Sequence, residues 1–180
     1  MSHRLTNSRF ALPAIPLLYA ALAIRYALAT PVLESSDEYK HYPFVQYVQT
    51  QSRLPILDPA DPGLWLQEAA QPPLYYLLMA ALTAPINTSD LPDLHHKNEQ
   101  AFIGDPNQAG NKNLIIHDPV REAFPWQGSV LAIYLIRLAS IGLGLGTLAL
   151  TAVLAQRIFS PLTALLAVAL TAFNPMFLFI

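Results

Sequence analysis

Two neighbouring carboxylates, Asp37 and Glu38, are the residues best suited to catalysis in this chain. They follow a long apolar N-terminal segment by a few residues and begin a short stretch with helical periodicity. If the apolar segment spans a bilayer, a carboxylate at this position lies at the membrane surface, where it can deprotonate an acceptor hydroxyl or amine as a general base. Alternatively, both acids only complement the dipole of the helix that they begin.

Two arginines inside apolar segments, Arg25 and Arg137, form a second candidate group. An arginine within a spanning helix is costly and commonly marks a functional site. A guanidinium pairs well with phosphate, so both side chains are candidates for binding an anionic lipid phosphate. The alternative is that both reach outward to lipid head groups with no further role.

Metal and nucleotide sites are not predicted. His95 and His96 are adjacent, so they do not share a helical face, and no second cluster has ligand spacing. The chain has no cysteine, which excludes thiol nucleophiles and cysteine-ligated metals. We therefore expect no cofactor and no metal, and nothing in the sequence supports a divalent cation. Gly142 and Gly146 form a GxxxG pattern that predicts close helix packing.

The composition indicates a membrane protein. Of the 180 residues 53% are hydrophobic and only 12% are charged, about half of the usual charged fraction. Mean hydropathy is +0.35. An intrinsically disordered chain would be poorer in apolar residues and richer in charge. A net charge of −2 offers no basic surface for nucleic acid, so membrane lipids are the expected partners and no protein partner is indicated.

The charge distribution predicts the topology. All twelve acidic residues lie between Glu34 and Glu122 with five basic residues, which gives this stretch a net charge of −7. The charged side chains of the two ends are all arginines: Arg4, Arg9, Arg25, Arg137 and Arg157. Because basic flanks mark the cytoplasmic side, the N-terminus is predicted inside and residues 34–128 outside the cytoplasmic membrane. A cleaved signal peptide ending near Ala29 is the alternative for the first segment.

We therefore predict an all-α polytopic membrane protein with three transmembrane helices. The first part, 1–33, contains a cytoplasmic N-terminus and the first spanning helix; 34–128 is an external acidic loop. The second spanning helix lies within 129–157, and 158–180 is a third that the chain does not complete. The loop should hold two juxtamembrane helices, at about 35–52 and 72–85. Ser35 and Glu38 have capping-box spacing in the first.

The segment 72–85 allows two interpretations. Its dozen apolar residues would form a helix of about 18 Å, too short for a hydrocarbon core of about 30 Å. We expect it to lie at the outer membrane interface. The alternative, a spanning segment, would move Arg157 to the outside.

Three motifs, in order, resemble the N-terminal part of C-type-fold membrane glycosyltransferases, the dolichyl-phosphate mannosyltransferase and aminoarabinose transferase superfamily. They are SSDEYKHY, QPPLYYLL and IYLIRLASIGLG, which contain Asp37, Gln71 and Arg137. The resemblance implies that Asp37 is the catalytic base and that the second motif lies in a juxtamembrane helix. Gln71 takes the position of a basic residue that approaches the lipid phosphate in some relatives. Ala70 stands where the aminoarabinose branch has an acid, and Glu68 lies nearby.

The resemblance implies transfer of a sugar from a polyprenyl-phosphate or polyprenyl-diphosphate donor to an acceptor outside the cytoplasmic membrane. Such enzymes have many more spanning helices than three, so the resemblance implies that this chain is part of a longer protein and inactive by itself. The competing interpretation is non-enzymatic: a small polytopic membrane protein whose external loop binds a ligand or partner.

Overall fold

The computed structural model describes residues 3–178, with side chains from residue 12 onward. Within this part of the chain the fold is all-α, with seven α-helices, one 3-10 helix and no β-strand. An isolated bridge joins Lys97 to Ile115. Two compact units form: Thr30–Ile136, called here the loop unit, and Met1–Ala29 with Arg137–Ile180, called the apolar unit.

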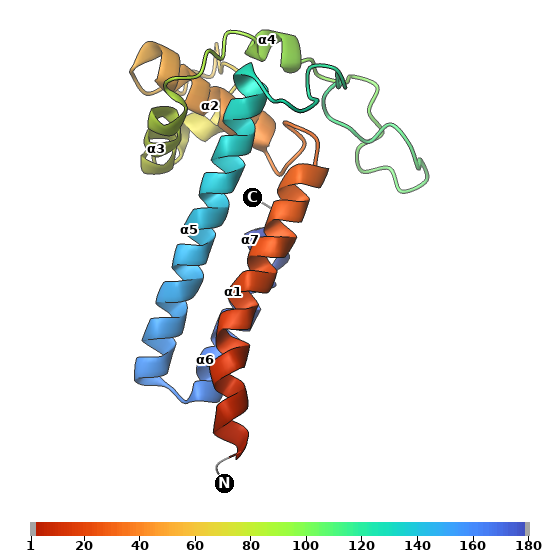
Figure 1. Cartoon of the computed structure of the whole chain (residues 1–180). Helices are drawn as coiled ribbons and strands as arrows, with labels where there is room; N and C mark the ends of the chain where they lie inside the picture. Colours follow the sequence, from red (N-terminus) through yellow and green to blue (C-terminus); the bar gives the residue numbers. More distant parts are fainter. Residues whose placement is uncertain (1–2, 179–180) are drawn as a thin grey trace. The chain divides into compact units, whose positions relative to one another are not determined.

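Figure 1 shows the order of the helices. They are α1 (His3–Ala29), α2 (Glu38–Gln51), η1 (Leu66–Ala70), α3 (Leu74–Thr83), α4 (Leu91–Leu94), α5 (Gly128–Ile158), α6 (Pro161–Ala172) and α7 (Pro175–Leu178).

Two helices, not three, are long and apolar enough to cross a membrane: α1 through its window Leu12–Ala29, and the 31-residue α5. The expectation of a third spanning-length helix is wrong for the described residues. α6 has 12 residues and therefore covers about 18 Å. It ends at Ala172 because a proline, Pro175, follows shortly, and the residue before a proline is disfavoured in the α conformation.

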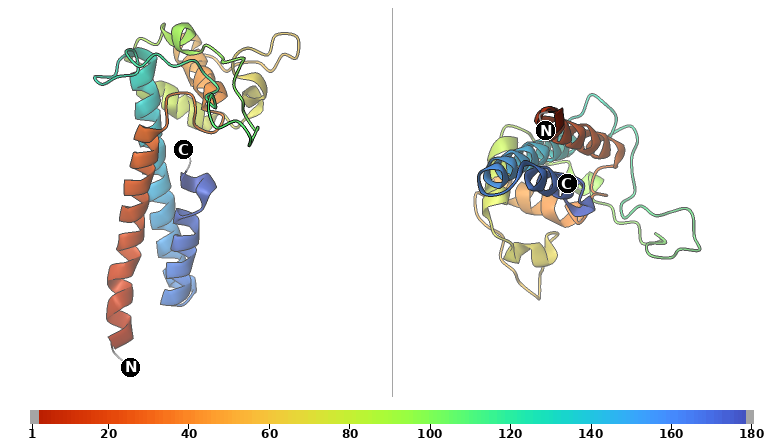
Figure 2. Two further views of the ribbon diagram at one scale, coloured as in Figure 1. Left: turned by 90° about the vertical axis from the view of Figure 1, so that its right-hand side faces the viewer. Right: turned by 90° about the horizontal axis from the view of Figure 1, so that it is seen from below.

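The apolar unit is built on contacts of α1 with α6, which runs along it (Figure 2). Its buried core contains Tyr19 and Ala23 from α1, Leu148 from α5, and Val168 from α6. The glycine that permits close packing is Gly144, where an added Cβ would collide with the Tyr19 hydroxyl.

Gly142 and Gly146, the two glycines of the GxxxG pattern, are not the residues at which the helices pack closely. A Cβ added at Gly142 or at Gly146 would meet no atom within 4 Å. The close-packing prediction was therefore correct for the segment and wrong for the residues, because the middle glycine of the run faces Tyr19.

The loop unit is built around the pairing of α2 with α3. The rings of Phe44 and Tyr76 stack with centroids 3.7 Å apart. The first turn of α5 is fixed by Asp90, whose carboxylate accepts hydrogen bonds from the Ser129 backbone N–H (2.9 Å) and hydroxyl (2.7 Å). A carboxylate is stabilised at a helix N-terminus by the unpaired N–H groups there.

The two predicted loop helices exist with different ends. The first begins at Glu38 rather than near 35, with Asp37 as its N-cap, so Ser35 is not the capping residue. The second is shorter than predicted, and Pro85 lies beyond its end. Sequence patterns did not predict η1 or α4, which are only five and four residues long.

Candidate functional site

The turn that joins α1 to α2 holds two residues in the left-handed region, Leu33 at φ 64° and Asp37 at φ 54°. Asp adopts this conformation at low cost, whereas a left-handed leucine costs on the order of 1 kcal/mol or more. Leu33 is held there because its side chain is buried and its N–H donates to the Glu38 carboxylate at 2.7 Å. The local backbone that presents Asp37 is thus fixed by tertiary contacts.

The structure separates the two acids by environment. The Asp37 side chain is 51% exposed, and its Oδ1 accepts a hydrogen bond from Lys40 Nζ at 2.8 Å. This hydrogen bond holds the pKa of Lys40 above its usual value. Glu38 instead uses Oε2 to accept the Leu33 N–H. Asp37 is therefore the more accessible of the two carboxylates, and Glu38 stabilises the turn that precedes α2.

A second polar group, one helical turn beyond Asp37, was not predicted from the sequence. His41 Nδ1 lies 2.8 Å from the Tyr76 hydroxyl and 3.8 Å from Glu68 Oε2. Glu68 is only 4% exposed, and Gln67 Nε2 donates to its other oxygen at 2.9 Å. Burial, together with the charge of Glu68, raises the pKa of Tyr76 to about 12.

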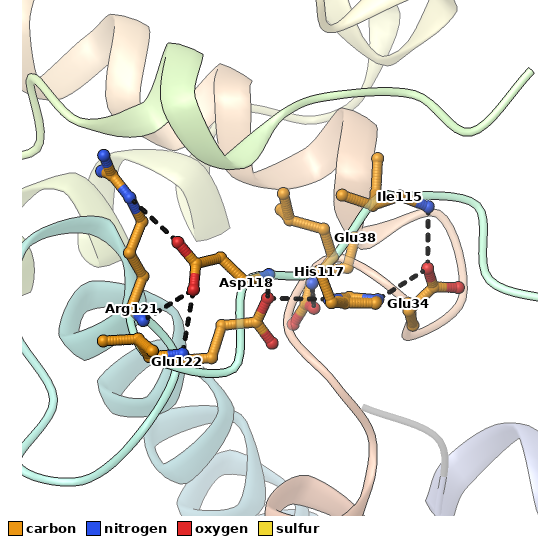
Figure 3. A network of polar contacts seen from close by, with 9 residues as sticks. Glu34, Glu38, Ile115, His117, Asp118, Arg121 and Glu122 are labelled. Atoms are coloured by element: carbon orange, nitrogen blue, oxygen red, sulfur yellow. Dashed lines mark hydrogen bonds and ion pairs between the residues drawn. The ribbon is translucent and has the colours of Figure 1, made fainter.

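A third polar group joins Glu34, which precedes α2, to the segment around His117 and is shown in Figure 3. His117 places Nε2 3.1 Å from Glu34 Oε1 and Nδ1 2.8 Å from Glu122 Oε1. The same Glu34 oxygen accepts the Ile115 N–H at 2.9 Å. This group ties the segment 115–122 to the turn that precedes α2.

The remaining predicted site residues lie in different settings. Arg25 is exposed on α1. Arg137 is 1% exposed, and its Nη1 donates to the Ala27 carbonyl at 2.7 Å, one of the last carbonyls of α1 that lack a partner within the helix. Gln71 is exposed between η1 and α3, the two elements that contact α2. Arg4 and Arg9, used to predict orientation, have side chains outside the described set.

Among the described residues no group of three or more His, Asp or Glu side chains converges as metal ligands would. His95, expected in a solvated loop, places Nε2 2.7 Å from the Tyr39 carbonyl and is half-buried. Comparisons with known protein families, curated proteins and solved structures found no match to the chain.

Proposed function

We propose that the chain forms the N-terminal part of an integral-membrane glycosyltransferase that uses a polyprenyl-phosphate-linked sugar as donor. The observation that supports this best is the pairing of α2 with α3, which joins the SSDEYKHY and QPPLYYLL motifs in one unit. The Phe44–Tyr76 stack and the His41–Tyr76 hydrogen bond hold the pair together. Motifs far apart in the sequence are thus packed in the unit that also presents the exposed Asp37 carboxylate.

In this proposal Asp37 is the general base of the transfer. Its carboxylate takes the proton of the acceptor hydroxyl while the acceptor oxygen bonds to the anomeric carbon of the sugar. The bond from that carbon to the phosphate oxygen breaks, and polyprenyl phosphate leaves with the electron pair. Lys40 orients the carboxylate through its 2.8 Å contact with Oδ1.

In this proposal Arg25 keeps the role of binding the donor phosphate that the sequence predicted, and Gln71 is a separate candidate for that role. Both side chains are exposed and therefore accessible to a ligand, and a guanidinium forms strong, charge-assisted hydrogen bonds to phosphate. Arg137, the third residue predicted from the sequence, is given a different role here. Its buried contact with the Ala27 carbonyl supports a structural function at the end of α1.

The proposal includes a membrane arrangement. α1 and α5 cross the cytoplasmic membrane with the N-terminus inside and residues 34–128 outside. α3 lies at the outer interface. Its face toward α2 buries Tyr76, Met79 and Thr83, and its leucines are exposed: Leu74, Leu77, Leu78 and Leu82. One buried face and one exposed apolar face suit a helix at a lipid surface.

The test is donor consumption in membranes from cells that express the protein from its complete reading frame. A radiolabelled polyprenyl-phosphate sugar is supplied, and released polyprenyl phosphate is quantified against membranes from cells lacking the gene. We expect turnover that depends on the gene and on an added hydroxyl acceptor. Donor that remains intact while it binds to the protein would favour the non-enzymatic ligand-binding interpretation and overturn the proposal.

A further inference from the structure

An open, shallow cavity of about 490 Å³, with polar and apolar surface in similar amounts, lies in the loop unit between the second half of α2 and the segment that follows α3. One wall belongs to the stretch from Gln46 to Gln51 and the other to the stretch from Ala84 to Ser89. Its volume falls in the range of small-molecule sites, about 300–1,000 Å³. The residues assigned above to catalysis and donor binding do not line this cavity.

Hydrogen bonds of Gln49 hold the two walls of the cavity together without a ligand. Gln49 Nε2 donates to the carbonyls of Thr83 and Ile86 at 2.8 and 2.7 Å. Its Oε1 accepts the Thr88 hydroxyl at 2.9 Å. One amide therefore ties the segment after α3 to α2 at three points. A preformed wall of this kind reduces the entropy lost on ligand binding.

The lining carries hydrogen-bonding groups without charge. Its described side chains are amides, hydroxyls, one phenol and two aliphatic groups, with no acid, lysine, arginine or histidine among them. Several keep hydrogen-bonding capacity toward the cavity. The Thr50 hydroxyl donates to the Gln46 carbonyl at 2.9 Å and can still accept, and Asn87 uses Oδ1 for the Ser89 N–H and retains its amide hydrogens.

This chemistry selects a class of ligand. An ion would lose its hydration with no opposite charge in the lining to compensate. An apolar ligand would displace the water that is bound to the amides and hydroxyls and would offer no hydrogen bonds in its place. Each polar group left without a partner would weaken binding by about 1–3 kcal/mol. A neutral ligand rich in hydroxyl groups satisfies donors and acceptors alike. Tyr47 contributes its phenol to the lining, while its ring contacts Trp65, with centroids 4.6 Å apart, and the Arg53 guanidinium, 5.6 Å from the ring centroid.

We propose that this cavity binds a neutral carbohydrate. The proposal stands on the lining alone and does not rest on the proposed glycosyl transfer.

The experiment measures saccharide binding by saturation-transfer NMR with the whole protein in lipid nanodiscs. Lactose is the neutral probe, glucuronic acid the charged probe and 1,6-hexanediol the less hydroxylated probe. We expect saturable lactose binding and at least fivefold weaker binding of the other two. Gln46→Met removes one amide from the lining at similar volume and should weaken lactose binding at least fivefold, as the loss of a hydrogen bond predicts.

Gln108→Met is the matched control, because Gln108 is an exposed loop residue outside the cavity. Thr50→Val, a second lining variant, covers the case in which Gln46→Met fails to fold, as judged by circular dichroism. Equal lactose affinity in lining and control variants, equal binding of the three probes, or no saturation would each overturn the inference. If the protein shows Asp37-dependent transfer but does not bind lactose, this inference fails and the proposed function stands. If it binds lactose but shows no transfer, the proposed function fails and this inference stands.

Discussion

At the scale of single residues, Asp37 carries the strongest claim. We predict that Asp37→Asn inserts and folds normally, because asparagine also adopts the left-handed conformation that the backbone has at φ 54°. The amide cannot accept the acceptor proton. Transfer should therefore fall by roughly 10²–10⁴-fold, the usual range for loss of a general base. The measurement is the release of polyprenyl phosphate per copy of membrane-inserted protein.

Two variants control for charge and for the neighbouring acid. Asp58→Asn removes an exposed carboxylate from the connector after α2 and should leave the transfer rate unchanged. Glu38→Gln should lose less activity than Asp37→Asn, because the amide oxygen still accepts the Leu33 N–H. Normal turnover in Asp37→Asn with none in Glu38→Gln would move the base to Glu38. Normal turnover in both Asp37→Asn and Glu38→Gln would contradict the assignment of a catalytic base to either residue.

The raised pKa of Tyr76 predicts how the free energy of unfolding depends on pH. Its pKa is raised to about 12 by burial and by the charge of Glu68, whereas an unfolded tyrosine ionises near pH 10. The unfolded state therefore releases its proton first, and the free energy of unfolding should fall as the pH rises from 10 to 12. Tyr76→Phe lacks this contribution. The free energy of unfolding, measured with denaturant, should therefore fall less steeply with pH in the variant than in the parent protein. Equal slopes in the two proteins would contradict the assignment to Tyr76.

The sequence predicted the site only where its residues are neighbours in the chain. Asp37 and Glu38 are adjacent and follow an apolar segment, so their position was visible. His41, Glu68 and Tyr76 meet only because α2 packs on η1 and α3. Glu34 and His117 are 83 residues apart, and no local pattern links them.

At the scale of helices, the close approach of Gly144 to Tyr19 can be tested by alanine substitution. Gly144→Ala should lower the free energy of unfolding by about 1–3 kcal/mol, because the added methyl group collides with the Tyr19 hydroxyl in a packed core. Gly142→Ala and Gly146→Ala meet no neighbour and should gain up to about 1 kcal/mol from helix propensity. The measurement is reversible unfolding in mixed micelles.

A rescue variant makes this test specific. In a Tyr19→Phe background the hydroxyl is gone, so Gly144→Ala should cost clearly less than in the parent protein. If all three alanine variants have the same stability, α5 does not approach Tyr19 at Gly144.

Helix positions were more predictable than helix ends. Apolar length located α1 and α5, and proline spacing located α3. The start of α2 was misplaced because the capping-box pattern of Ser35 and Glu38 was visible, whereas the tertiary burial of Leu33 that sets the turn was not. The length of α6 was overestimated because apolar composition continues past Ala172, while the backbone ends the helix before Pro175.

At the scale of the whole molecule, composition and charge predicted more than any motif. The net charge of −7 coincides with a stretch that largely matches the loop unit, Thr30–Ile136, and the arginine-only ends match the apolar unit. Sequence could not show that residues 86–136 pack with α2 into one core. That core joins Val32, Tyr42, Leu91, Ile115 and Val130, which are scattered over a hundred residues.

The absence of cysteine permits a direct test of topology. We predict that Asn113→Cys, in the loop unit, reacts in intact cells with a maleimide that cannot cross the membrane. Phe159→Cys, in the exposed connection between α5 and α6 beside Arg157, should react only after the cells are opened, because basic flanks stay inside. The ten-residue α3 covers about 15 Å and is too short to cross a core of about 30 Å. Only α5 lies between the two positions, so they are separated by one crossing. Labelling of Phe159→Cys but not of Asn113→Cys in intact cells would mean that α3 crosses the membrane and that Arg157 lies outside. Labelling of both cysteines in intact cells would mean that α5 does not cross.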